Sequence, residues 1–408
     1  MTIIDSSPRF VIDFDHHDAE FRDNNKEVVA RLHATGRKIG WSEAHGGYWA
    51  FFGYDAVYDA VQDWELFSSL HDLAGGCPKG VPGSTNPTQL LPIDADGPMV
   101  HEYRKLLLSW FSPGTAKADE QRIRDICNEL IDTFIESGQC DLTNDLLMPL
   151  PARLILEKLD WQPERWGEWI EWVHGMIHDR TSNPEKSQRD IEAIFGNIVQ
   201  EMIKRREQLG DDLFSDLLQA QIAGKALEDP QIIGYSILLL LGGMDTTAGL
   251  TGNVIALLDQ RHDLRQQLID DPSLWPTALE EFLRHDSPSY GLYRTVTRDA
   301  VFHGEQLRKG ERVVLMFPAA GLDPNVYPDP DGIDLRRTGN RHMAFGLGPH
   351  RCLGSHHARV MSTVMLSEVL RRMPDFRVAG ELHRFADAGD VYAIKSLPLT
   401  FTPGPRSH

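Results

Sequence analysis

The chain has 408 residues, of which 41% are hydrophobic and 25% charged, and its formal net charge is −19. This composition is ordinary for a globular protein with a sizeable core, and the negative charge argues against nucleic acid as a partner. The first twenty residues have neither a basic start nor a long apolar run, so we expect no signal peptide and no membrane anchor. Four dispersed cysteines without a CxxC pair are typical of free thiols in a reducing cytoplasm.

The N-terminal third mixes strand-like and helical patterns. The apolar run GGYWAFF at 46–52 predicts a strand inside a β-rich part at about 37–60. The segment 76–87, GCPKGVPGSTNP, is rich in glycine and proline and predicts a loop.

Residues 98–285 follow a helical pattern almost throughout. One predicted helix carries Trp166, Trp169, Trp172, Val173 and Met176 on a single face, which indicates a packed core stripe. A longer apolar helix is predicted to begin at Asp229, with Pro230 in its first position, and to reach about residue 262. Its length is on the order of 50 Å, so it crosses the whole molecule.

The sequence GGMDTT interrupts this long helix near its middle. Two interpretations are open. In the first, Gly242 and Gly243 form a close helix contact and Thr246 bonds back to the carbonyl four residues earlier. In the second, the helix opens locally and the carboxyl of Asp245 and the hydroxyl of Thr246 pass protons to a neighbouring site, which explains why an acid lies in an apolar helix.

After residue 288 the pattern changes to short strands, at about 290–325 and 376–402, with a helix at 352–373 between them. Just before this change, Glu281 and Arg284 in LEEFLRHDSP lie three residues apart on a helix and can pair. Taken alone, such a pair is most often a solvated surface pair of small energy.

The segment HMAFGLGPHRCLGSHHAR, residues 342–359, contains one cysteine within a glycine-rich turn. Gly346 and Gly348 permit a tight turn, and Gly354 leaves space for a flat group. Cys352 precedes the last long helix, whose dipole is expected to favour the thiolate. A buried structural cysteine is one interpretation; zinc is another, with ligands drawn from His342, His350, Cys352, His356 and His357.

These three motifs together resemble those of the cytochrome P450 superfamily in its soluble bacterial form. The resemblance runs from about residue 10 to the C-terminus. It implies one catalytic domain over 1–408, mainly α with a smaller β portion, with haem b between the long central helix and the cysteine-loop helix. The metal would then be haem iron rather than zinc.

The resemblance also implies roles for individual residues. Cys352 matches the axial iron ligand, Phe345 the aromatic near the sulfur, and Asp245 with Thr246 the acid–alcohol pair that assists proton delivery to dioxygen. Glu281 and Arg284 match a buried structural pair. Its third partner is one of Arg336, Arg337 and Arg341.

Cations for the haem propionates are implied at His350, Arg294 and Arg104, while Gly346 and Gly354 belong to the haem-binding segment. Three positions depart from the family pattern. The histidine usual four residues before Arg104 is Val100, with His101 one residue late; Gly242 stands where alanine is commoner; and Gly321–Leu322 replace polar or basic residues. The expected substrate pocket includes Leu239, Gly242, Tyr290, Leu292, Val391 and Tyr392.

The implied activity is a monooxygenase reaction on a small or medium hydrophobic substrate, with dioxygen as co-substrate and electrons from NAD(P)H. Five arginines and no acid lie between residues 336 and 367, which predicts a basic face for an acidic ferredoxin served by a reductase. We expect a cytoplasmic monomer. The alternatives are a peroxide-using peroxygenase and a non-catalytic haem or zinc sensor; the Asp245–Thr246 pair argues against both.

Overall fold

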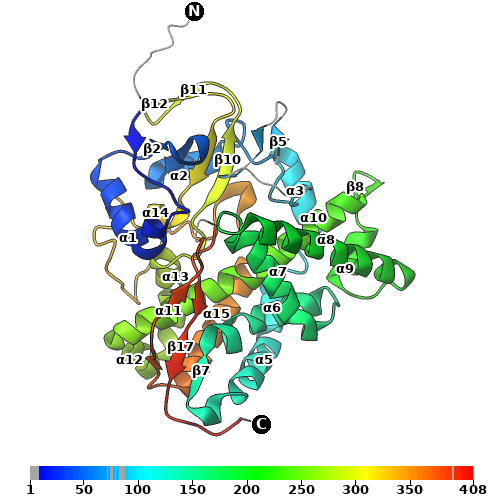
Figure 1. Cartoon of the computed structure of the whole chain (residues 1–408), viewed down its shortest axis with the longest axis vertical. Coiled ribbons are helices and arrows are strands. Elements are labelled where there is room, and N and C mark those ends of the chain that lie inside the picture. The colour runs from blue at the N-terminus through cyan, green and yellow to red at the C-terminus, as the bar shows by residue number, and fades with distance from the viewer. Residues whose placement is uncertain are drawn as a thin grey trace, which may run out of the picture.

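The computed structural model describes residues 9–70, 72–73, 77–78, 80–81, 88–387 and 390–407. A β-rich part with the N-terminal helices forms one end of the molecule, and the remaining helices form the other (Figure 1). Much of the loop predicted at 76–87 lies outside the described residues. The mainly α architecture with a smaller β portion agrees with the sequence prediction.

The largest sheet has the strand order β1-β2-β3-β13-β10-β4. Every residue of β3 is buried, because the sheet is covered on both faces there, which explains the unbroken apolar run of GGYWAFF. The strands are β1 (Val11–Ile12), β2 (Ile39–Ser42), β3 (Tyr48–Phe51), β4 (Phe67–Ser68), β10 (Leu292–Val296) and β13 (Arg312–Leu315).

Two predicted β-rich ranges are too long: 290–325 includes helix α14 (Phe317–Gly321), and 37–60 overlaps a helix at its end. Residues 54–60 belong to helix α2 (Tyr54–Gln62), because Ala56, Val57, Ala60 and Val61 recur with helical spacing and bury one face. Helix α1 (Ala19–Ala34) precedes the sheet strands β2 and β3.

Smaller sheets and ribbons contain the other strands. Two of them interrupt the part expected to be helical, because β7 pairs with the C-terminal β17 and β8 pairs with β9 in a hairpin. The strands are β5 (Asp72–Leu73), β6 (Cys77–Pro78), β7 (Gln139–Asp141), β8 (Gln221–Ile222), β9 (Lys225–Ala226), β11 (Ala300–Phe302), β12 (Glu305–Leu307), β14 (Arg377–Val378), β15 (His383–Arg384), β16 (Ile394–Ser396) and β17 (Pro398–Thr400).

The helical part packs around one extended core. In α7, Trp169, Val173 and Met176 are buried, while Trp166 and Trp172 are partly buried against the same core. The helices are α3 (Gly97–Lys105), α4 (Pro113–Ala118), α5 (Glu120–Asp132), α6 (Pro149–Lys158), α7 (Trp166–His178), α8 (Pro184–Glu207), α9 (Leu213–Gln219), α12 (His262–Asp270), α13 (Trp275–His285), α14 (Phe317–Gly321) and α15 (Ser355–Arg372).

The long central helix consists of α10 (Asp229–Met244) and α11 (Thr246–Gln260), which meet at Asp245. The N-cap is Glu228, one residue before the predicted one, and it forms a capping box with Gln231. By length and composition alone, the combined 32 residues are long and apolar enough to cross a membrane. However, 72% of the most apolar window is buried inside the protein, as in a core helix.

Candidate active site

A cavity of about 460 Å³ separates the central helix from the cysteine segment. Gly242 and Thr246 line it from the helix, and Phe345, Cys352 and Gly354 line it from the cysteine segment. A Cβ atom added at Gly242 or Gly354 would meet no atom within 4 Å. Both walls therefore leave open space where any other residue would place a side chain.

The cysteine segment is shaped by its glycines. Gly346 and Gly348 have φ values of +62° and +64°, a region that favours glycine. The N–H of Gly346 donates to the Met343 carbonyl at 2.7 Å, and the N–H of Cys352 donates to the Phe345 carbonyl at 2.7 Å. This turn directs Cys352 to the cavity, three residues before α15 begins.

The Cys352 thiol is not activated by the protein alone. Burial raises its pKa, and this effect outweighs the Gly354 N–H and the charges of Arg104, Arg359 and Arg351, which lower it. The expectation that the helix N-terminus favours the thiolate stays a prediction, since the Gly354 N–H lowers the pKa of Cys352 while desolvation raises it. A metal cation on the sulfur would supply the missing compensating charge.

Glu281 and Arg284 form a fully buried ion pair on α13, with both side chains 0% exposed. The guanidinium donates two hydrogen bonds to the carboxylate, at 2.8 and 2.9 Å. The third partner is Arg337, whose Nε donates to Glu281 Oε2 at 2.9 Å. Burial would raise the pKa of Glu281, but the bonds from Arg284 and the Asp334 N–H outweigh it and lower the pKa. This pair is thus part of the core rather than an ordinary surface pair.

Glu280, the residue before this pair, was not singled out in the sequence. Its carboxylate accepts two hydrogen bonds from Arg359, at 2.6 and 2.8 Å, and one from His342 at 2.9 Å. The Arg359 guanidinium lies over the Phe345 ring, 4.5 Å from its centroid. Glu280 therefore links α13 to α15 and to the cysteine segment. In the sequence, nothing indicates that the adjacent acids Glu280 and Glu281 both bind partners inside the protein.

Asp245 and Thr246 point in different directions from the helix junction. Thr246 lines the cavity and donates its hydroxyl to the Gly242 carbonyl at 3.1 Å, as in the first interpretation of GGMDTT. Asp245 is fully buried, does not line the cavity, and faces α7 instead. Asp245 is the junction residue between α10 and α11, and its backbone stays in the right-handed helical region with a φ of −101°.

Two histidines on α7 bind the Asp245 carboxylate. His178 Nε2 lies 2.9 Å from Asp245 Oδ2, and His174 Nε2 lies 3.5 Å from Oδ1. Burial would raise the pKa of Asp245, but the histidines outweigh it and hold the pKa well below its usual range. Burial lowers the pKa of His174, whereas Asp245 overcomes burial and raises the pKa of His178. The Asp245 carboxylate and the His178 imidazole thus each favour the charged form of the other.

Asp387 anchors the same end of α7. Its carbonyl accepts from His178 Nδ1 at 2.9 Å, and its carboxylate accepts from Thr181 at 2.6 Å. The other carboxylate oxygen lies 2.7 Å from His17 Nδ1 in the N-terminal segment. One residue thus connects α7, the N-terminal segment and the C-terminal part of the chain.

Comparison with known proteins identifies the family. A family model for cytochrome P450 matches residues 254–379. A steroid C26-monooxygenase from Mycolicibacterium smegmatis (strain ATCC 700084 / mc(2)155) is 36% identical over 357 residues, which cover 86% of each chain. This chain belongs to the cytochrome P450 family. It is a cytochrome P450 monooxygenase.

Other similar proteins agree with this assignment. A linalool 8-monooxygenase from Pseudomonas putida is 30% identical over 389 residues, covering 92% of this chain and 95% of its own. The crystal structure of CYP109E1 from Bacillus megaterium in complex with testosterone has a TM-score of 0.85 and 29% identity, over 94% of this chain and 99% of that chain. The fold of this cytochrome P450 is therefore the family fold.

Members of this family use haem and dioxygen, and the cavity fits haem. Arg294 is buried, and burial lowers its pKa to about 10 despite the charges of Asp96 and Asp94. No carboxylate among the described residues forms an ion pair with Arg294 or with the half-buried Arg104. Such guanidinium groups suit the carboxylates of a haem. His350 and Arg104 line the cavity, whereas Arg294 lies behind its wall and His101 is exposed outside it.

Four of the six expected substrate-pocket residues line the cavity, namely Leu239, Gly242, Leu292 and Val391. Tyr290 and Tyr392 do not; their rings pack against each other with centroids 5.4 Å apart. Gly291, between Tyr290 and Leu292, has a φ of +150°, and a Cβ there would lie 2.0 Å from the Leu315 carbonyl oxygen. The wall also contains a charged pair that sequence reasoning missed, Arg180 with Asp390 at 2.9 Å.

The predicted basic face is smaller than expected. Arg337 and Arg359 pair with Glu281 and Glu280, and Arg336 pairs with Asp271 at 3.3 Å. Arg341 and Arg351 are exposed and form no ion pair with the described residues. Acids distant in sequence thus neutralise three of the five arginines.

The zinc interpretation of the cysteine segment is wrong. His342 binds Glu280, and His357 binds Asp119 at 2.9 Å, so the histidines point to separate partners. Within the described part of the chain, the one group of three metal-ligating side chains that converges is His174, His178 and Asp245.

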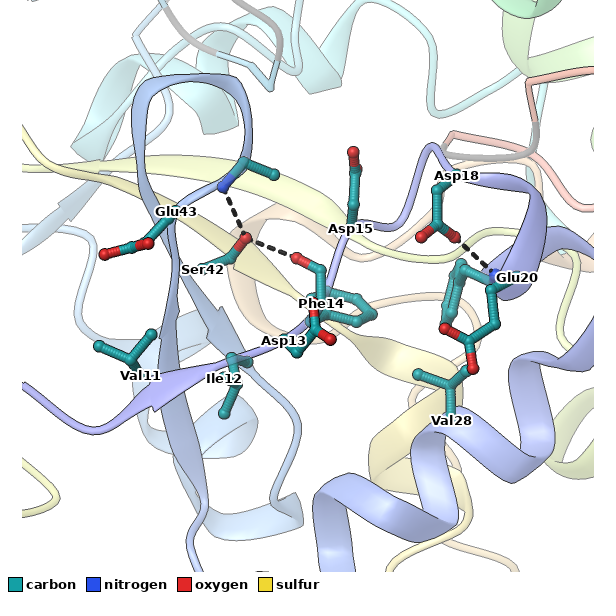
Figure 2. Close-up of a pocket in the computed structure, with 12 residues that line it drawn as sticks. Val11, Ile12, Asp13, Phe14, Asp15, Asp18, Glu20, Val28, Ser42 and Glu43 are labelled. Carbon is teal, nitrogen blue, oxygen red and sulfur yellow. Dashed lines mark hydrogen bonds between the residues drawn. The ribbon is translucent and has the colours of Figure 1, made fainter.

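A second cavity, of about 260 Å³, lies beside the N-terminal segment and is lined by several acids, including Asp13, Asp15 and Glu43 (Figure 2). Ser42 closes its wall by donating to the Phe14 carbonyl at 2.5 Å and accepting from the Ala44 N–H at 3.2 Å. None of the predicted site residues lines this cavity. The chemistry of this cytochrome P450 therefore belongs to the larger one.

Proposed function

We propose that this cytochrome P450 holds haem b through Cys352 and hydroxylates a steroid or terpenoid, with the whole chain, 1–408, acting as one catalytic domain. The observation that supports this most is the large cavity, whose walls are mostly apolar and carry Cys352 on one side and Thr246 on the other. The similar proteins include one named for steroid C26 oxidation and one for linalool 8 oxidation. Both named substrates are hydrophobic isoprenoid molecules.

In this proposal, the residues in and behind the cavity wall have different roles. The open space at Gly242 and Gly354 admits a flat ring; Arg104 and His350 on the cavity wall would bind its carboxylates, and Arg294 behind the wall would add positive charge. Haem supplies the oxygen-activating chemistry that no side chain can perform. Apolar side chains such as Leu239, Leu292 and Val391 orient the substrate and exclude water.

Thr246 and Asp245 manage protons at the central helix. The Thr246 hydroxyl faces the cavity and can exchange its bond to the Gly242 carbonyl for one to a water or oxygen atom there. Asp245, one residue away and behind the helix, is a proton carrier that must first leave His178. Release of that ion pair is therefore part of the proposed cycle.

Electrons come from NAD(P)H through a reductase and an acidic ferredoxin in the cytoplasm. The support is the exposed pair of cations, Arg341 and Arg351, on the cysteine side of the cavity. Replacing both by glutamate is expected to slow reduction by the ferredoxin at low salt while leaving chemical reduction unchanged. Equal rates of reduction by the ferredoxin would contradict this surface.

The deciding experiment is a carbon monoxide difference spectrum of the reduced protein, followed by turnover of a panel of steroids and terpenes under ¹⁸O₂. We expect a red-shifted Soret band and incorporation of one ¹⁸O atom into a product. Cys352→Ser is expected to abolish both, whereas Cys140→Ser, at a partly buried cysteine distant from the cavity, keeps both. A normal band in Cys352→Ser would contradict the ligand assignment.

The source of electrons distinguishes a peroxygenase from the proposed monooxygenase. Turnover with hydrogen peroxide that exceeds turnover with NAD(P)H, reductase and ferredoxin would overturn the monooxygenase proposal. Binding of substrates without product formation in either assay would favour a sensor.

A further inference from the structure

The cluster of His174, His178 and Asp245 lies outside the cavity wall that carries the proposed chemistry. We propose that these three side chains form a binding site for a divalent zinc ion, between helix α7 and the junction of α10 and α11.

The ligand set and its spacing fit zinc. The three ligand atoms lie within 4.8 Å of one another; His178 Nε2 lies 2.9 Å from Oδ2 of Asp245, and His174 Nε2 lies 3.5 Å from Oδ1. A tetrahedral ion about 2.0–2.1 Å from each ligand sets neighbouring ligand atoms roughly 3.3 Å apart. Two imidazoles and one carboxylate, with water in the fourth position, are a common zinc set.

The chain holds these ligands in place before any ion arrives. His174 and His178 are four residues apart in the last turns of α7, so their rings project from one face of the helix. Phe385 stacks on His178 at 3.8 Å between centroids and meets His174 edge-on at 4.7 Å. The rings are therefore fixed by packing on the side opposite the carboxylate.

The second shell also suits a metal. His178 Nδ1 donates to the Asp387 carbonyl, which leaves Nε2 as the atom directed at Asp245. An outer hydrogen bond of this kind orients a zinc-binding histidine. On the carboxylate, Oδ1 is buried and has no well-formed hydrogen bond, so one ligand atom remains available.

Access and local charge are compatible with an ion. Asp245 and His178 are 0% and 2% exposed, whereas His174 is 20% exposed and forms the open side of the site. The nearest cation, Lys186, is held by Asp179 and Asp190 at 2.9 and 2.7 Å. Its charge is thus compensated. Zinc would occupy the carboxylate that the proposed function assigns to proton transfer, and that consequence rests on the proposed function.

The test uses the haem-loaded enzyme stripped of loose metal with a chelator. Calorimetric titration with ZnCl₂ is expected to show one tight site per chain, and the zinc X-ray absorption spectrum should show only nitrogen and oxygen neighbours, near 2.0 Å. His174→Ala is expected to weaken this affinity by more than the roughly 10–100-fold that loss of an outer-shell partner costs. His303→Gln, at an exposed His–Asp pair, is the matched control.

Four outcomes decide the proposal. The absence of a stoichiometric site in the unaltered enzyme, or equal zinc affinity in His174→Ala, would overturn it. Because His178→Ala could fail to fold, His174→Ala carries the decision. A tight site whose occupation lowers product yield supports both proposals. A tight site without effect on yield supports the zinc site and counts against the role of Asp245 in turnover.

Discussion

Two buried carboxylates, Glu281 and Asp245, show opposite ways of holding a charge inside this protein. Both side chains are 0% exposed, and each binds two cationic or cation-forming side chains. Glu281 is held by the guanidinium groups of Arg284 and Arg337, and Asp245 by the imidazoles of His178 and His174. Arginine stays protonated at every relevant pH, whereas histidine gains or loses its proton near neutrality.

The difference matches the two regions. Around Glu281, permanent charges fix α13 to the segment that leads to Cys352. We call the ion pairs of Glu281 with Arg284 and Arg337 the brace. Around Asp245, the partners are exchangeable, and the carboxylate sits where the central helix is interrupted. Stability is thus concentrated on the cysteine side, and the capacity for change on the α7 side.

Breaking the brace should have the largest effect. Glu281→Gln leaves Arg284 and Arg337 buried or half-buried without their counter-charge, and we expect a loss of about 3–5 kcal/mol of unfolding free energy. Urea denaturation of the haem-loaded protein measures it. A loss below about 1 kcal/mol would mean that the brace is dispensable.

Removing the charge on the other side should affect chemistry first. Asp245→Asn is expected to lower product formed per NAD(P)H by about 10²-fold, because a proton-transfer group is lost. The carbon monoxide spectrum should remain normal. Asp263→Asn, in an exposed pair with Arg261, is the control for charge alone. An unchanged product yield in Asp245→Asn would mean that Asp245, like Glu281, has only a structural role.

The choice of third partner for Glu281 can be tested directly. Arg337→Ala removes a hydrogen bond to a buried charged group and should cost about 1.5–3 kcal/mol of unfolding free energy. Arg336→Ala removes an exposed pair with Asp271, 64% and 40% exposed, and should cost at most about 1 kcal/mol. The reverse order in urea denaturation would contradict the structure.

The smallest effect concerns pH and Glu280. Burial would raise its pKa, but Arg359 and His342 outweigh it and lower the pKa from 4.5 to about 2. The resulting stabilisation is present above pH 4.5 and is lost as pH falls towards 2. Because the carboxylate is partly exposed, we expect roughly 1–2 kcal/mol. The gap in unfolding free energy between the unaltered protein and Glu280→Gln should therefore shrink below pH 4.5; a constant gap would contradict it.

The sequence predicts what depends on neighbours along the chain. The glycine turn before Cys352, the helix interruption at Asp245 and the α13 spacing of Glu281 with Arg284 are local, and the motifs carry them. The partners of these groups come from distant segments. His174 and His178 reach Asp245 only because α7 packs on α10, and Glu280 meets Arg359 only through the packing of α13 on α15.

Errors in the predicted pocket have the same origin. The family resemblance placed Tyr290 in the pocket with Leu292, but the Tyr290 ring packs against Tyr392 and does not line the cavity. The five arginines near Cys352 suggested a basic face, but three of them meet acids from other segments. Local patterns identify residue types and spacing, while burial and charge compensation depend on tertiary packing.

Asp387 joins three segments of the chain through its hydrogen bonds. His17, His178 and Thr181 all bind Asp387. Because of these shared hydrogen bonds, we expect a displacement of α7 from the cavity to disturb the N-terminal segment as well. We therefore predict that any opening of the cavity at α7 involves all three chain segments. Amide hydrogen exchange at residues 16–18 should slow when a ligand fills the cavity, although these residues do not touch it.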